Sequence, residues 1–429
     1  MIEFINLITF IWLLWWTALS VRRLCSDKKE SIDIVMLVLF FFCGVPLLLD
    51  VTLGKPEYTM QPGFAVACQD PTTNYIYCLY MAFIPPFWRF VNHWVKGGRQ
   101  DFKQGFIEIK KSDAYHFSKR PIIRVVLAVL LISPIVVAAL SPDYMQYLTF
   151  AHVLRGSLHY EFNDWHSIVS MFASISIAAG AYIVFIGRAR IISLSNMITV
   201  YPFLLADSWL KGKRSTIALS IFLIITIRWL KDEYKGRSLI FALFFGLFLL
   251  MGFSFAYQEF TDRIAGKPLY DSFRIDYGRD GVIKMSIYAE LNPSHMKILE
   301  YRGQSILFYA TMAIPRKLWQ EKPLPYAQYV TSAMFFSTPR LWGWGMTTSI
   351  LDEAVANAGW VGMVFGPLFI VLICLLGDKS VSPFVRLLTP LISVLLLTVQ
   401  IVAFAPLFMI WIGTYIFSGG GLRRSLILK

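Results

Sequence analysis

The chain has 429 residues and a net charge of +13; 56% of its residues are hydrophobic and only 16% are charged. A soluble domain carries about a quarter charged residues, so this composition excludes a soluble enzyme, a secreted disulfide scaffold and a disordered chain. The basic residues lie mostly in short loops between apolar segments, which favours orientation in a bilayer over binding of nucleic acid.

The apolar segments predict an all-α integral membrane protein with about 11 transmembrane helices, within a range of roughly 10–13. Taken along the chain, the predicted spans are 4–21, 32–50, 74–95, 121–141, 166–187, 191–209, 215–230, 238–256, 353–376, 387–404 and 406–418. The last two are one apolar run, which we divide at Pro406 because it is too long for one span and short for two.

The charge of the loops predicts the orientation. Loops 22–31, 96–120 and 231–237 and the C-terminal tail are basic, and they fall on one side if the spans alternate. The positive-inside rule makes that side cytoplasmic. The turn at 211–214 is also strongly basic, yet it falls outside when the spans are counted in order. Either the helices around it form a shallow hairpin from the cytoplasmic side, or positive charge is needed outside.

Three parts follow from this orientation. Residues 1–256 form an N-terminal transmembrane bundle of about 8 spans. Residues 257–352 form a large helical extracytoplasmic cap between late spans, since this stretch mixes acids, bases, aromatics and prolines. Residues 353–429 form the C-terminal spans and a cytoplasmic tail.

The sequence has none of the common motifs for a nucleotide, a metal ion or a serine nucleophile. HExxH, the Walker loop, a helix-opening GxGxxG, GxSxG and a compact DxD pair are all absent. The five cysteines lack metal-ligand spacing, and only Cys68 and Cys78 could meet outside the cytoplasm. If the protein is an enzyme, we therefore expect it to act on lipid-borne substrates without a soluble nucleotide, and we predict no cofactor and no metal ion.

The predicted cap and the basic turn hold the polar residues that could carry chemistry. Arginine presents a planar fork of donors to phosphate and stays charged. The candidate substrate-binding residues are Arg214, Arg274, Arg279, Arg302, Arg340, Trp319 and Lys322. The candidate catalytic residues are Glu290, His295, Arg316 and Glu353. Glu290 and His295 are the candidate general bases, while ordinary ion pairing within the cap is the alternative for most of the arginines.

Two stretches of the second half carry a resemblance to a known family. Residues 303–323 read GQSILFYATMAIPRKLWQEKP, and residues 349–362 read SILDEAVANAGWVG and open a span. This pattern resembles the bacterial O-antigen polymerases, the Wzy-type polymerases of lipid-linked oligosaccharide repeat units. The GKRS at 212–215 is similar to a basic turn of the same superfamily. The matching residues are Pro315, Arg316, Trp319, Lys322, Pro323, Glu353, Asn357 and Gly359.

The resemblance implies a reaction, a location and a set of partners. Such enzymes join undecaprenyl-pyrophosphate-linked repeat units on the outer face of the bacterial cytoplasmic (inner) membrane, without nucleotide or metal. The implied partners are those lipid-linked oligosaccharides, membrane lipids and a chain-length regulator protein. The leaving group is a lipid pyrophosphate, and we expect Arg214 and Arg316 to stabilise its charge.

Two alternatives remain open. One is the O-antigen ligase of the same superfamily, which moves a finished chain onto a lipid A core or a protein. The other is a non-enzymatic transporter of polysaccharide or lipid, which would be expected to place ionisable residues around a midplane cavity. The predicted spans are nearly free of charge, and the exceptions Arg89, Asp207 and Arg228 lie near span ends. This distribution favours surface chemistry over transport.

Overall fold

A computed structural model of the whole chain shows how these segments fold. The structure describes residues 1–26, 30–58, 61–96, 120–148, 160–186, 198–212, 214–231, 233–234, 236–260, 269–339, 341, 345–380 and 382–418. These residues form helices joined by turns, and no β-strand occurs among them. The predicted all-α class is therefore confirmed for the described part of the chain.

Helices of membrane-spanning character are present. Within the described residues, five helices are long and apolar enough to cross a bilayer: Ile2–Leu24, Ser31–Thr52, Pro121–Ala139, Trp165–Ile186 and Ile350–Lys379. Shorter apolar helices are Ala218–Leu230, Arg237–Gly246, Pro383–Thr398 and Ile401–Phe417. The transmembrane character expected from composition is supported, whereas the count of about 11 spans stays a prediction.

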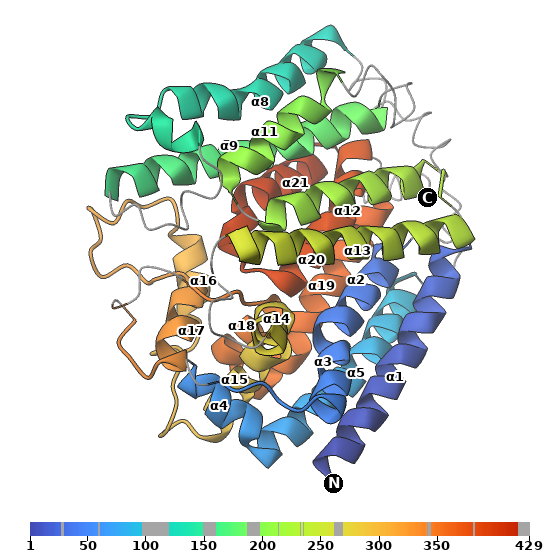
Figure 1. Cartoon of the computed structure of the whole chain (residues 1–429), viewed down its shortest axis with the longest axis vertical. Helices are drawn as coiled ribbons and strands as arrows, with labels where there is room; N and C mark the ends of the chain where they lie inside the picture. Colours follow the sequence, from blue (N-terminus) through green and yellow to red (C-terminus); the bar gives the residue numbers. More distant parts are fainter. Residues whose placement is uncertain are drawn as a thin grey trace, which may run out of the picture.

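The central bundle is built from the helices of both ends of the chain. Its members are α1 (Ile2–Leu24), α2 (Ser31–Leu39), α3 (Val45–Thr52), α5 (Pro71–Lys96), α19 (Gly362–Lys379) and α20 (Pro383–Thr398). A π-helical turn, Phe40–Gly44, makes α2 and α3 one continuous rod. Helix α1 packs on α5 and α2, and α19 packs on α5 and α20 (Figure 1). The indole of Trp88 in α5 donates to the carbonyl of Pro367 in α19 at 2.9 Å, which joins the two halves of the chain.

A second group of helices lies along the top of Figure 1. It contains α8 (Pro121–Ala139), α9 (Tyr160–Ile186) and α11 (Tyr201–Lys211), with α12 (Arg214–Leu230), α13 (Arg237–Phe260) and α21 (Ala405–Phe417) below them. The basic turn between α11 and α12 bends at Gly212, which has a left-handed φ of 57°. The Lys211 ammonium donates to Ser174 of α9 at 2.9 Å, so this turn packs against a neighbouring helix.

The third group gathers at the end of the bundle where α3 ends and α5 begins, at the lower left of Figure 1. It consists of α4 (Pro62–Gln69), α14 (Leu269–Tyr277), α15 (Asp280–Leu291), α16 (Gln304–Ala310), α17 (Tyr326–Met334) and α18 (Ile350–Ala358). Helix α15 packs against α4, α5 and α18. The described residues between 269 and 349 thus form short helices joined by turns, and their position outside the cytoplasm stays a prediction.

Two ion clusters mark the ends of the α2–α3 rod. At one end, Asp33 is bound by Arg23 and Arg89. At the other end, Asp50 lies 2.9 Å from Arg274 of α14. The two aspartates are 17 residues apart, or ~25 Å along a helix, close to the ~30 Å hydrocarbon core of a bilayer. This separation puts α14 and α15 at the end of the rod opposite to Arg23 and Arg89, and which end faces the cytoplasm stays a prediction.

Candidate functional site

The two stretches that carry the family resemblance meet in space. In α16, Ser305 donates to the Glu353 carboxyl of α18 at 2.6 Å, and the Tyr309 hydroxyl donates to its other oxygen at 3.1 Å. The side-chain amide of Asn357, one turn further along α18, donates to the Ser305 hydroxyl at 2.7 Å. Glu353 is only 2% exposed. This buried network therefore fastens α16 onto α18.

Local sequence sets where α18 begins and ends. Ser349 caps the helix, and the Asp352 carboxylate accepts from the Ser349 backbone N–H at 2.7 Å, which completes a capping box. Asp352 is thereby used at the helix start, while Glu353, one residue later, faces α16. The helix ends at Gly359, whose φ of 64° and ψ of −142° suit glycine alone, and the chain then turns into α19.

An exposed arginine lies beside this helix end. Arg302 pairs with Glu290 of α15 through two bonds of 2.5 Å, and it also donates to the carbonyl of Ala356 at 3.1 Å. A Cβ at Gly359 would lie 3.3 Å from both the guanidinium and the Glu290 carboxylate, so the glycine leaves room for the pair. The Arg302 side chain is 57% exposed, against 12% for Glu290. We call Glu290, Arg302 and Gly359 the Arg302 site.

Arg302 and Tyr309 both stay in the protonated state, in which each side chain donates hydrogen bonds. The hydrogen bonds with Glu290 raise the pKa of Arg302, so this guanidinium remains charged. Burial and the neighbouring Glu353 raise the pKa of Tyr309, so its phenol stays protonated and donates. The planar guanidinium of an arginine held by its neighbours is suited to binding the oxygens of an anionic group such as phosphate.

The other predicted residues of the second half make contacts with residues outside the Arg302 site. His295 follows α15, is exposed, and contacts the rings of Tyr288 and Phe336 at centroid distances of 6.0 and 5.7 Å. The Arg316 guanidinium donates to the carbonyl of Lys322 at 2.9 Å, and the Lys322 ammonium donates to two further carbonyls. Catalysis by Arg316 and substrate binding by Lys322 stay predictions, and these backbone carbonyls occupy part of the hydrogen-bonding capacity of both side chains.

Arg274 and Arg279 make different contacts from those expected of substrate-binding residues. Arg274 is 3% exposed and lies in a buried cluster with Asp50, Asp280 and Lys284. The Arg279 guanidinium donates to the carbonyl of Thr398 at the end of α20, at 3.0 Å. These contacts hold α14 and α15 onto the central bundle, because they cross from one helix group to the other.

The remaining predictions concern Trp319, Arg214, Arg340, the cysteines and metal binding. Trp319 is partly buried in the turn after α16, and the side chain of Arg214 and the whole of Arg340 lie outside the described residues. Cys68 and Cys78 do not form a disulfide. Among the described residues, no group of three or more His, Cys, Asp or Glu side chains could hold a metal ion.

Sequence reasoning missed Ser305, Tyr309 and the ion cluster around Asp50. The hydroxyls carried no signal, because serine and tyrosine are common in membrane helices and their partner is 44 or more residues away. Asp50 did carry a signal. It ends an otherwise apolar run at a point where a buried charge requires a partner.

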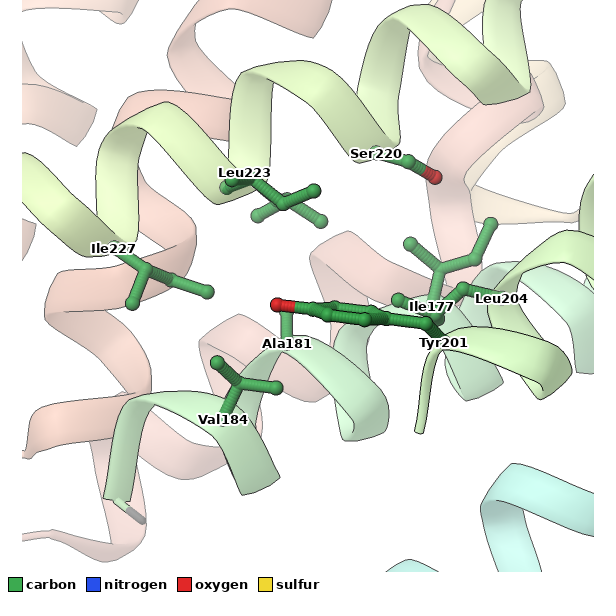
Figure 2. A pocket seen from close by; sticks show the side chains of 9 residues that line it. Ile177, Ala181, Val184, Tyr201, Leu204, Ser220, Leu223 and Ile227 are labelled. Carbon is green, nitrogen blue, oxygen red and sulfur yellow. The ribbon is translucent and has the colours of Figure 1, made fainter. Parts of the chain in front are cut away.

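A small, mostly apolar pocket lies between α9, α11 and α12 (Figure 2). Its lining residues are Ile177, Ala181, Val184, Tyr201, Leu204, Ser220, Leu223, Ile224 and Ile227. No charged side chain is among them, and apolar cavities of this kind stay dry. The pocket is therefore not a site for a sugar or a phosphate.

The geometry at Gly359 gives a first prediction. Gly359→Ala should lower the free energy of unfolding by about 1–3 kcal/mol, because alanine disfavours this backbone conformation, and its Cβ should also displace the Arg302–Glu290 pair. Gly303→Ala is the matched control, since Gly303 has a φ of 78° but no atom within 4 Å of the added Cβ. The measurement is thermal stability in detergent, and equal losses for both variants would contradict a role of Gly359 in seating the pair.

Comparison with known proteins identifies no relative of this chain. No protein-family model, no curated protein and no solved structure matches this chain.

Proposed function

We propose that the protein is a membrane glycosyltransferase of the bacterial inner membrane. It joins undecaprenyl-pyrophosphate-linked oligosaccharide repeat units into O-antigen or a related surface polysaccharide, on the outer face of that membrane. One observation carries the proposal. The two stretches that resemble the polymerases pack together through Ser305 and Glu353, and they hold the exposed Arg302 at the predicted outer end of the bundle.

The chemistry follows from the charges of the site. A hydroxyl of the incoming repeat unit attacks the anomeric carbon of the growing chain, and the bond from that carbon to the pyrophosphate breaks. Negative charge grows on the leaving pyrophosphate, and a fixed guanidinium nearby stabilises it. Arg302 takes this role, and Glu290 positions it through the paired hydrogen bonds.

The proton of the attacking hydroxyl needs an acceptor. Glu290 is engaged with Arg302, so the exposed His295, four residues after the end of α15, is the better general base of the two candidates. Glu353 is a positioning residue in this scheme, since its two oxygens are engaged by Ser305 and Tyr309 in the interior. The proposal requires neither a nucleotide nor a metal ion.

The polysaccharide of cells lacking this chain tests the proposal. We expect such cells to carry single repeat units on the lipid A core, because units would still be made and attached without being joined. Electrophoresis of lipopolysaccharide, with restoration by the intact gene, is the measurement. Full-length polymer left on the lipid carrier would instead identify a ligase, and an unchanged profile would remove the proposed function.

A further inference from the structure

The segment around the Pro315–Pro323 motif exposes an unusual number of large apolar side chains. Leu318 is 81% exposed and Ile306 is 62% exposed. The apolar-basic surface, as we define it, comprises Ile306, Leu307, Met312, Ile314 and Leu318 together with the exposed Arg316 and Lys317. Apolar side chains concentrated in this way mark a surface that binds a partner or a membrane.

The backbone of this segment is braced from within. Between α16 and α17 the chain forms turns without a regular helix. The Lys322 ammonium donates to the carbonyls of Met312 and Ile314 at 3.0 and 2.9 Å. The Arg316 guanidinium donates to the carbonyls of Lys322 and Pro323 at 2.9 and 3.1 Å. Four carbonyls are thus satisfied by side chains of the same segment.

These hydrogen bonds to backbone carbonyls would stabilise the segment if it lies against lipid. In water an exposed carbonyl is solvated at little cost, whereas irregular backbone at membrane depth is tolerated only if its polar groups have partners within the protein. The same two side chains therefore allow the turn to leave water without losing hydrogen bonds. This gives the basic residues of the motif a role that does not require contact with a substrate.

The neighbouring helix sets the position of this surface. Helix α16 is fastened to α18 through Tyr309 and Glu353, and α18 leads through Gly359 into α19, part of a candidate membrane-spanning stretch. Exposed Val361 and Phe365 lie at the start of α19, where they would face lipid. Through α16 and α18, the apolar-basic surface is therefore attached to the start of a candidate membrane-spanning stretch.

We propose that the apolar-basic surface docks on the surface of an anionic phospholipid bilayer. Leu318, Ile314 and Met312 lie below the headgroups, and Lys317 meets the lipid phosphates. An interfacial segment of this kind binds through buried apolar area together with attraction between basic side chains and anionic lipids. The inference does not depend on the proposed reaction, since it concerns only where this segment lies.

Fluorescence depth measurements test the docking. A Leu318→Cys variant of the full chain, with the partly exposed Cys25 replaced by serine, is labelled with an environment-sensitive dye. It is then reconstituted in vesicles of phosphatidylglycerol and phosphatidylethanolamine. We expect a blue-shifted emission that is quenched several-fold more by spin-labelled lipid than by aqueous iodide. Vesicles without phosphatidylglycerol, or a second change Lys317→Glu, should weaken the lipid quenching.

The matched control is Lys297→Cys, because Lys297 is also exposed but lies before α16, outside the apolar-basic surface. Its dye should remain accessible to iodide and insensitive to lipid quencher. Emission from position 318 that matches this control would overturn the proposal. Shielding of position 318 from both quenchers would also overturn it, since it would show that a protein covers the surface.

Discussion

Replacing Arg302 by alanine should reduce polymer formation by roughly a hundred-fold or more, at normal protein abundance. The reason is that the guanidinium is the exposed cation held between α15 and the end of α18, where it would stabilise the leaving pyrophosphate. Arg302→Lys should restore little, because an ammonium cannot form the two parallel bonds to phosphate oxygens that a guanidinium forms. The measurement is polymer length in a deletion strain, with immunoblotting of the variant protein.

Two further variants separate catalysis from simple clamping. Lys297→Ala removes another exposed cation of the same region, and it should leave the polymer unchanged. Glu290→Gln keeps the shape of the pair but removes its charge, so it should impair polymerisation less than Arg302→Ala does. If Arg302→Ala gives normal polymer at normal abundance, Arg302 is not at the site. If the variant loses activity only in proportion to lost protein, the pair merely joins the helices.

The second large effect is expected at Asp280, where substitution should impair folding. Asp280 is fully buried and lies 2.7 Å from Arg274 and 3.0 Å from Lys284. With Asp50 the cluster is neutral, so Asp280→Asn leaves an uncompensated positive charge in the interior. Removing one partner of a buried ion pair costs about 3–5 kcal/mol. We expect a large drop in the unfolding temperature in detergent.

Restoring neutrality should restore stability. The double variant Asp280→Asn with Lys284→Met leaves only Arg274 and Asp50, whose charges cancel, so it should be more stable than Asp280→Asn alone. Asp271→Asn on α14, which lies outside the cluster, is the control and should have little effect. A double variant that is less stable than either single variant would show that packing, rather than charge balance, governs this cluster.

The cluster also predicts how stability depends on pH. Burial alone would raise the pKa of Asp280, but Arg274 and Lys284 outweigh it and hold that pKa below its usual value. Its contribution is therefore present above pH ~4 and is lost as the pH falls further. Burial alone would lower the pKa of Lys284, yet Asp280 raises it, so that contribution is present below pH ~10 and is lost as the pH rises through the raised value. Unfolding temperatures of wild type and Asp280→Asn should converge at acid pH.

The sequence by itself determined the class of the protein and the elements of which it is made. Apolar runs of about twenty residues can satisfy their backbone only as helices in a bilayer, so composition and length sufficed for the all-α prediction. The sequence also singled out residues 303–323 and 349–362 as unusual. These properties are local, since each depends on residues that are neighbours along the chain.

Only the tertiary structure decided which polar residues act together. Arg274 and Arg302 look alike in sequence, but Arg274 meets Asp50, 224 residues away, and is buried, while Arg302 meets Glu290 and stays exposed. Arg316 matched the family pattern, yet its guanidinium holds the backbone of its own turn. An arginine side chain is long and can donate to carboxylate, carbonyl or phosphate oxygens, so its role depends on which partner the fold places within about 3 Å of it.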